Sequence, residues 1–156
     1  QIGAGVILPE KGNAFLSVRD ADKPRAVELA QKLVDLGFDL VATRGTAAAI
    51  KQAGLPVLRV NKVTEGRPHI VDMIKNREIA IVINTVEERR NAIADSRPIR
   101  THALAENLAY YTTIAGASAA VQGLHYLRHG DGLSVYSLQY LHAAEPVKAQ
   151  TAADAR

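Results

Sequence analysis

The sequence contains no cysteine and no tryptophan, and it has only five tyrosines and two phenylalanines. Without cysteine, disulfide bonds, thiolate zinc sites and cysteine nucleophiles are excluded. The small aromatic content excludes the base-stacking platforms on which single-strand nucleic-acid binders depend. No apolar run approaches the ~20 residues that a membrane-spanning helix needs. We therefore expect a protein without membrane contact, and we predict a cytoplasmic location.

The chain also has little excess of one charge over the other, since it has 19 basic and 16 acidic residues and a net charge of only +3. Both signs are mixed along the chain, which argues against a nucleic-acid partner and suits a small anionic ligand. The 156 residues, 47% of them hydrophobic, are enough for one globular domain with its own core.

The two ends of the chain differ in composition from its middle. The chain starts with Gln1 rather than Met and has no signal-peptide pattern, which is typical of a piece of a longer polypeptide. Residues 1–12 are rich in glycine and are predicted to be a linker from a preceding domain. Residues 13–143 are predicted to form the domain, and the Ala-rich residues 144–156 a flexible tail.

Apolar runs and helical patterns alternate along most of the chain. Strands are predicted at residues 14–18, 38–42, 56–60, 79–83 and 109–114, and helices at 22–37, 47–53, 69–74, 97–107 and 115–127, with a last strand or helix at 133–141. This order predicts right-handed βαβ units and an α/β fold with one mostly parallel sheet.

The segment at residues 39–50 has the composition of a phosphate-binding turn. An apolar run leads into Thr43, Arg44, Gly45 and Thr46, and a helix-forming stretch follows at once. Open N–H groups in the first turn of that helix, the hydroxyls of Thr43 and Thr46, and close backbone approach at Gly45 would suit phosphate. A plain helix cap with a glycine turn fits the same residues equally well.

Polar groups also follow the other predicted strands. They lie at residues 20–23, 61–62 and 84–85, and ligands of open parallel sheets bind outside the carboxyl ends of the strands. Lys23 and Lys62 would supply charge to a phosphate, and Asn84 would contact a base or ribose. Four suitable loops together favour a nucleotide-type anion as the ligand.

A catalytic group is harder to find. Asp20 and His69 are candidates for acid–base chemistry, although Asp20 fits a helix cap equally well. His69 and Asp72 share a helix face, but no third ligand completes a metal site. The other histidines have no triad partner in the sequence; they are His102, His125, His129 and His142. The residues therefore predict binding without catalysis.

The run Asn-Lys-Val-Thr-Glu-Gly-Arg-Pro-His-Ile at residues 61–70 resembles the C-terminal regulatory domain of the carbamoyl-phosphate synthase large subunit. Collinear matches over about residues 12–143 agree with it, namely Leu-Ser-Val-Arg at 16–19, Ala-Thr-Arg-Gly-Thr-Ala at 42–47, Ile-Asn-Thr at 83–85, Asp-Ser-Arg at 95–97 and Tyr-Tyr-Thr-Thr at 110–113. The resemblance implies the methylglyoxal synthase-like fold, a Rossmann-like three-layer α/β/α sandwich.

In this family the domain binds UMP as inhibitor and IMP as activator in one phosphate-holding site. By resemblance the site consists of Lys23, Thr43, Gly45, Thr46, Lys62, Asn84 and Thr85. The family often has a further hydroxyl in the residue pair after Asn84, where this chain has Thr85 and Val86.

The resemblance also implies binding of ornithine, an activator, between this domain and the synthetase body. Tyr110 and Thr112 are at the matching positions, and Tyr111 stands where the family more often has an acidic residue. The other ornithine ligands lie outside this chain. Further partners implied are the rest of the large subunit and the small glutaminase subunit, with a contribution of the domain to oligomer assembly.

The parent enzyme makes carbamoyl phosphate from bicarbonate, glutamine and two ATP for arginine and pyrimidine synthesis. It uses ATP with magnesium or manganese, with potassium as a further candidate ion. This chain is expected to carry out none of that chemistry and to need no cofactor of its own. It would act on the catalytic body by coupling of ~1–3 kcal/mol.

Two enzymes of related sequence remain as alternatives. A lyase similar to methylglyoxal synthase would have a carboxylate after the glycine of the loop at 65–67, where this chain has Arg67 after Gly66. The IMP cyclohydrolase domain shares the Leu-Ser-Val strand and the Thr-x-Gly-Thr-Ala turn. Its Lys-Thr-Leu-His-Pro-type segment does not occur in this sequence.

Overall fold

The computed structural model describes residues 8–86 and 90–130. Its strands are β1 (Gly12–Ser17), β2 (Phe38–Thr43), β3 (Leu58–Val60), β4 (Ile79–Asn84) and β5 (Ala109–Tyr111), and its helices are α1 (Lys23–Asp35), α2 (Arg44–Gln52), α3 (Ile70–Lys75), α4 (Arg90–Ala105) and α5 (Ile114–His129). Two short 3-10 turns, η2 (Asp20–Asp22) and η3 (Val63–Glu65), follow β1 and β3. The predicted element at 133–141, the tail at 144–156 and most of the predicted linker lie outside the described residues.

The five described strands form one parallel sheet in the order β3-β2-β1-β4-β5. The first strand therefore lies at the centre, and the chain extends the sheet on one side with β2 and β3 and on the other with β4 and β5. The predicted α/β class with a parallel sheet is confirmed. All carboxyl ends of the strands meet at one edge, where ligands of such sheets bind.

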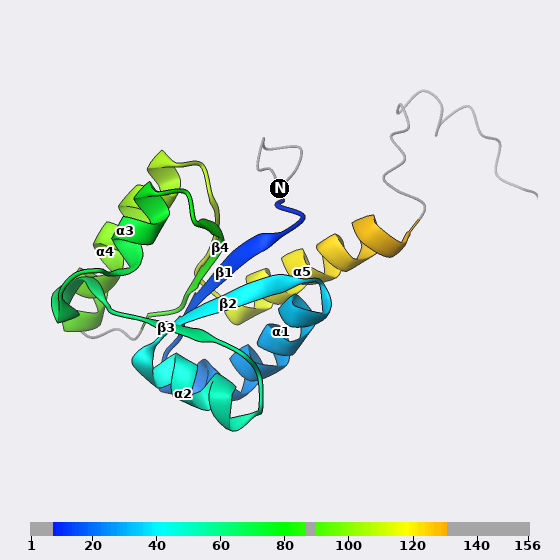
Figure 1. Cartoon of the computed structure of the whole chain (residues 1–156), viewed down its shortest axis with the longest axis horizontal. Coiled ribbons are helices and arrows are strands. Elements are labelled where there is room, and N and C mark those ends of the chain that lie inside the picture. Colours follow the sequence, from blue (N-terminus) through cyan, green and yellow to red (C-terminus); the bar gives the residue numbers. More distant parts are fainter. Residues whose placement is uncertain (1–7, 87–89, 131–156) are drawn as a thin grey trace, which may run out of the picture.

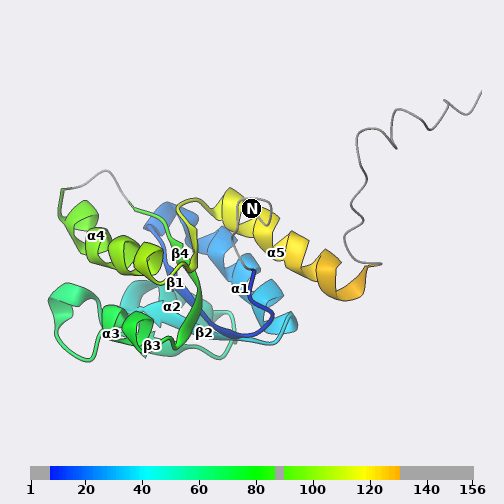
Figure 2. The same cartoon turned by 90° about the horizontal axis from the view of Figure 1, so that it is seen from above.

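Helices cover both faces of the sheet and create two separate cores (Figures 1 and 2). One core packs α1, α2 and α5 against Leu16 of β1, and the other packs α3 and α4 against Phe15. Because successive side chains of a strand point to opposite faces, these two neighbouring residues serve different cores. Both side chains are fully buried.

Two helix starts differ from the prediction. α2 begins at Arg44, directly after β2, so Gly45 lies in the first helical turn and makes no separate tight turn. α4 begins at Arg90, well before the predicted start near residue 97, and contains Pro98 inside the helix. A proline removes one N–H from a helix, which normally favours a helix end. Here the helix continues through it, and Ile99 and Ala103 remain buried against α3 and the sheet.

The last two described elements, β5 and α5, lie close to their predicted positions. β5 ends at Tyr111, earlier than predicted, because Thr113 caps α5 by accepting a hydrogen bond from the Gly116 N–H at 3.1 Å. Among the described residues, no helix is long and apolar enough to cross a membrane.

Candidate functional site at the carboxyl edge of the sheet

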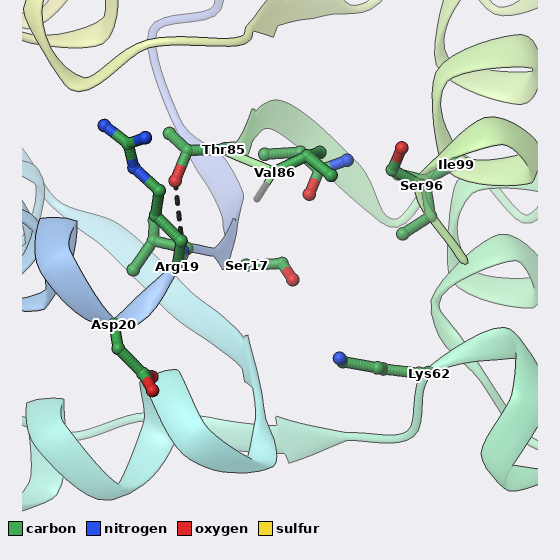
Figure 3. A pocket seen from close by; sticks show the side chains of 10 residues that line it. Ser17, Arg19, Asp20, Lys62, Thr85, Val86, Ser96 and Ile99 are labelled. Carbon is green, nitrogen blue, oxygen red and sulfur yellow. Dashed lines mark hydrogen bonds between the residues drawn. The ribbon is translucent and has the colours of Figure 1, made fainter. Parts of the chain in front are cut away.

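A pocket of about 220 Å³ lies at the carboxyl ends of β1 and β4, beneath α4 (Figure 3). Its lining comes from four segments far apart in sequence and consists of Ser17, Val18, Arg19, Asp20, Lys62, Asn84, Thr85, Val86, Ser96 and Ile99. The predicted residues Lys62, Asn84 and Thr85 are therefore brought together. The other predicted phosphate residues lie around the start of α2, beside the pocket.

Thr43 and Thr46 fasten the start of α2 to the end of β1. The Thr43 hydroxyl donates to Ser17 Oγ at 3.3 Å, and the Val18 N–H donates to Thr46 Oγ1 at 3.1 Å. Both threonines are almost completely buried. Thr43 holds the N-cap position without making a side-chain cap bond. The N–H groups of the first turn of α2 therefore receive no cap from Thr43, and a bound anion would satisfy them.

Gly45 lies beside the ammonium group of Lys23. A Cβ atom built on Gly45 would lie 3.5 Å from Lys23 Nζ. Lys23 thus places its charge beside the positive end of the α2 dipole, a position that favours a nearby anion. In this structure the carboxylate of Asp20 has that role, since its Oδ1 lies 2.7 Å from Lys23 Nζ.

Lys62 is held over the pocket by a closed loop. The loop returns to its start through a bridge between Asn61 and His69, and the Lys62 N–H donates to Glu65 Oε2 at 3.0 Å. Figure 3 shows the Lys62 side chain extending into the pocket toward Ser17, from the side opposite Asp20. The two lysines therefore approach the end of β1 from different elements.

Asn84 and Thr85 form the wall of the pocket at the end of β4. Thr85 is tied to the end of β1, because its N–H donates to the Ser17 carbonyl at 3.0 Å and its Oγ1 accepts from the Arg19 N–H at 3.1 Å. The Asn84 amide is 3% exposed, and its Nδ2 donates to the Tyr110 hydroxyl at 3.1 Å.

The two residues predicted from resemblance for ornithine are separated. The Tyr110 hydroxyl accepts the hydrogen bond from Asn84 Nδ2. Thr112 lines a different hollow of about 250 Å³, together with Arg19, Thr85 and Val86. Tyr110 is therefore linked directly to a residue predicted for the nucleotide.

Two described carboxylates are stabilised in their ionised form. A hydrogen bond from Arg19, at 2.7 Å, is the main cause that lowers the pKa of Asp22, and Thr85 and the charge of Arg25 act in the same direction. The pKa of Asp72 is lowered chiefly by the His69 N–H, which donates to it at 3.0 Å. The pair His69 and Asp72 therefore caps α3.

The described ranges offer few candidates for catalysis or metal binding. Arg67, at the position where the related lyase has its carboxylate, is mostly exposed and lies 3.8 Å from Asp72. Within residues 8–86 and 90–130, no group of three or more His, Cys, Asp or Glu side chains could hold a metal ion. Among the described residues that line the pocket, Asp20 is the one carboxylate.

The sequence reasoning missed Ser17, Ser96 and Ile99 as pocket residues. Ser17 ends β1, so its position at the carboxyl edge follows from the strand-end rule. Ser96 and Ile99 lie inside α4, whose start was placed too late. The Asp-Ser-Arg match at residues 95–97 was the only signal available for Ser96.

The sequence model of the MGS-like domain matches residues 25–112, which is more than half of the chain. The chain belongs to the MGS-like domain family. The MGS-like domain is 62% identical to the carbamoyl phosphate synthase large chain of Ralstonia nicotianae and 55% identical to that of Pseudomonas aeruginosa. Each match covers 92% of this domain's chain, and the chain spans about 13% of the length of these curated relatives.

A solved structure of methylglyoxal synthase from Elizabethkingia anophelis NUHP1 is also similar. It is 26% identical in sequence with a TM-score of 0.58, and the match covers 73% of this chain and 79% of that one. The resemblance noted in the sequence and the methylglyoxal synthase-like α/β fold are thereby confirmed.

Proposed function

We propose that this MGS-like domain is the C-terminal regulatory domain of a carbamoyl-phosphate synthase large subunit. Its pocket binds the phosphate of UMP- or IMP-type nucleotides at the α2 N-terminus, with Lys23 and Lys62 on either side. The ribose or base lies toward Asn84 and Thr85. The domain senses the nucleotide and does not convert it.

One observation carries this proposal, namely the placement of Lys23. Its ammonium lies against the N-terminal turn of α2, 3.5 Å from the position that a Cβ atom on Gly45 would take. A cation at the positive end of a helix is unfavourable unless an anion lies between or beside them. Asp20 partly meets this need, and a phosphate dianion, with more charge and more acceptor atoms, meets it better.

Calorimetric titration of the chain with UMP and with IMP tests the proposal. Both nucleotides are expected to bind, and at 100 times the Kd each is expected to stabilise the fold by roughly 2.7 kcal/mol, measured as a rise in Tm. Absence of binding of either nucleotide at millimolar concentration would contradict the proposal.

Lys62→Ala is the variant that tests the shared phosphate contact. A charge-assisted hydrogen bond contributes about 1.5–3 kcal/mol, so Kd is expected to rise roughly 10- to 150-fold for both nucleotides together. Lys51→Ala is the matched control, because Lys51 is exposed in the last turn of α2, away from the pocket. If only one nucleotide weakens, the two do not share a phosphate site.

The relatives support a wider role for the full-length protein. In this proposal the full-length protein makes carbamoyl phosphate from bicarbonate, glutamine and ATP with magnesium or manganese, and works with a small glutaminase subunit in the cytoplasm. Nucleotide binding here shifts its conformational balance by ~1–3 kcal/mol. Ornithine acts through Tyr110 and Thr112, with its remaining ligands on the rest of the large chain. We therefore expect weak ornithine binding to this chain alone.

A lyase of the methylglyoxal synthase type is the second candidate, and the observation in its favour is Asp20 in the pocket lining. The position after Gly66 is occupied by Arg67, which removes the expected base there. Incubation with dihydroxyacetone phosphate separates the two candidates. Methylglyoxal released at an enzymic rate, and abolished by Asp20→Asn, would replace the regulatory proposal.

A further inference from the structure

The carboxylate of Asp20 lies in the pocket where an anionic ligand is expected. Its Oδ1 is 2.7 Å from Lys23 Nζ, and Lys62 approaches the end of β1 from the opposite side (Figure 3). Lys23 Nζ is in turn 3.5 Å from the position that a Cβ atom on Gly45 would take, in the first turn of α2. The domain therefore supplies an anion of its own to the lysine that the proposed phosphate would use.

Asp20 is placed where its side chain can leave Lys23 at little cost. The Asp20 side chain is 84% exposed, whereas that of Lys23 is 30% exposed. Asp20 belongs to the 3-10 turn η2, which contains no buried residue. Other bonds hold this turn, since Arg19 Nε donates to Asp22 Oδ2 at 2.7 Å and the Asp22 N–H donates to the Arg19 carbonyl at 3.0 Å. A change of the Asp20 rotamer would therefore disturb neither the turn nor the core.

The ion pair between Asp20 and Lys23 is of a kind that a phosphate can replace. Ion pairs with an exposed member are screened by water and salt and contribute little to stability. A phosphate monoester has about two negative charges at neutral pH and three strong acceptor oxygens, so it binds a lysine more strongly than one carboxylate does. A carboxylate that stayed beside Lys23 would repel that phosphate, because like charges a few ångströms apart repel even in water.

We propose that Asp20 is an internal competitor for the phosphate site, which a ligand phosphate has to displace from Lys23. This inference rests on the proposed function, and it gives Asp20 the role of setting the affinity of the sensor. The apparent affinity of a site falls with the fraction of molecules in which that site is available. Asp20 therefore weakens the binding of every ligand whose phosphate uses Lys23, whatever base the ligand has.

A role of Asp20 in orienting Lys23 would have the opposite effect. If the carboxylate only held the ammonium ready for the ligand, its removal would weaken binding, because a preorganised group costs less to fix. Lys23 is the first residue of α1, and its Nζ lies beside the start of α2, so two helices already restrict where it can lie. The two roles of Asp20 therefore differ in the sign of the change in affinity.

Titration calorimetry of Asp20→Asn with UMP and with inorganic phosphate tests the proposal. Asparagine has nearly the same shape without the charge, and both ligands are expected to bind about two- to tenfold more tightly than to the unchanged domain. Uridine, which has no phosphate, is expected to gain nothing. Asp39→Asn is the matched control, because it removes the same charge from an exposed position near the start of β2, at the opposite edge of the sheet.

Two further variants separate competition for Lys23 from a general effect of charge. Asp20→Glu keeps the carboxylate and is expected to bind both ligands like the unchanged domain. In a Lys23→Gln background the contested ammonium is absent, so adding Asp20→Asn is expected to change UMP affinity by less than about twofold.

Equal or weaker phosphate binding by Asp20→Asn would overturn the competitor role, and so would an equal gain in Asp39→Asn. A gain with UMP but not with inorganic phosphate would also overturn it, because the effect would then lie away from the phosphate. The proposed function has a separate readout in the unchanged domain. Binding of inorganic phosphate without binding of either nucleotide would contradict the nucleotide sensor, while the comparison of Asp20→Asn with the unchanged domain would still decide the competitor role.

Discussion

A hydrogen bond to Tyr110 orients the side-chain amide of Asn84. Its Nδ2 donates to the Tyr110 hydroxyl, which is supplied by the adjacent strand β5. The groups that remain for a ligand are the carbonyl oxygen, which accepts hydrogen bonds, and the second Nδ2 hydrogen, which can donate one. Asn84 therefore suits a base or ribose, which has both donors and acceptors, and Tyr110 acts as a positioning residue.

Tyr110→Phe tests this residue-scale interpretation. Loss of the hydroxyl frees the amide to rotate, and loss of one such bond is expected to weaken UMP binding by about 0.5–1.5 kcal/mol, roughly 2- to 12-fold in Kd. Inorganic phosphate, which has no base or ribose, is expected to bind as before. Tyr126→Phe is the matched control on α5. Titration calorimetry with both ligands gives the answer, and equal UMP affinity in Tyr110→Phe and the unchanged domain would rule out the positioning role.

Some pocket residues could be predicted from the sequence and others could not. Lys62, Asn84 and Thr85 were predicted because they follow strands, and strands of a parallel sheet end at the same edge. Ser96 and Ile99 depend on how α4 packs over that edge, which no local pattern encodes. The link between Asn84 and Tyr110 requires the order of β4 and β5, known only from the assembled sheet.

At the scale of elements, the direct passage from β2 to α2 shapes the proposed anion site. Because the helix starts at Arg44, Gly45 lies in its first turn beside Lys23, where an alanine Cβ would make an ordinary van der Waals contact with Nζ. The sequence predicted a strand followed by a helix, but not that the two join without a turn. The threonine hydroxyls that make this junction possible bond to β1, which is distant in sequence.

Gly45→Ala is therefore expected to have two opposite effects. Alanine in place of a helical glycine is expected to stabilise the fold by about 0.5–1 kcal/mol. The added methyl group contacts Lys23 Nζ and fills space at the helix N-terminus, so nucleotide affinity is expected to fall. Thermal unfolding and calorimetry measure the two effects on the same protein.

Gly123→Ala, in α5, is the control for Gly45→Ala. Gly123 is also helical, and a Cβ there would meet nothing within 4 Å. It is expected to raise Tm in a similar way and to leave nucleotide affinity unchanged. A Gly45→Ala variant that binds UMP as tightly as Gly123→Ala would show that the space beside Lys23 has no role.

At the scale of the whole molecule, the stability of the domain is expected to depend on pH through Asp22. Its pKa is lowered in the folded state, first by Arg19. A lowered carboxyl pKa stabilises the fold above the unfolded pKa of about 3.9, and this contribution is lost as the pH falls through the folded value. Asp22→Asn is therefore expected to be less stable than the unchanged domain at pH 7, with the difference shrinking below about pH 4.

Denaturant unfolding at a series of pH values measures that difference. Arg19→Gln is the second variant in this experiment, because it removes the main cause of the lowered Asp22 pKa. It is expected to reduce the same pH-dependent contribution to the free energy of unfolding. The double variant is expected to lose little more than either single one. A stability difference between Asp22→Asn and the unchanged domain that stays constant down to pH 2 would contradict the role of Asp22.

The central position of β1 has a mechanical consequence. Any force applied to the segment before Gly12 enters the middle of the sheet, where β1 is paired in parallel with both β2 and β4. To slide, the strand would have to break both ladders at once, so it resists shear and carries tension along its length. The far end of this strand is Ser17, whose oxygen atoms bond Thr43 and Thr85 on opposite sides of the ligand site. Tension on the segment before Gly12 and occupancy of the proposed ligand pocket would therefore act on the same strand.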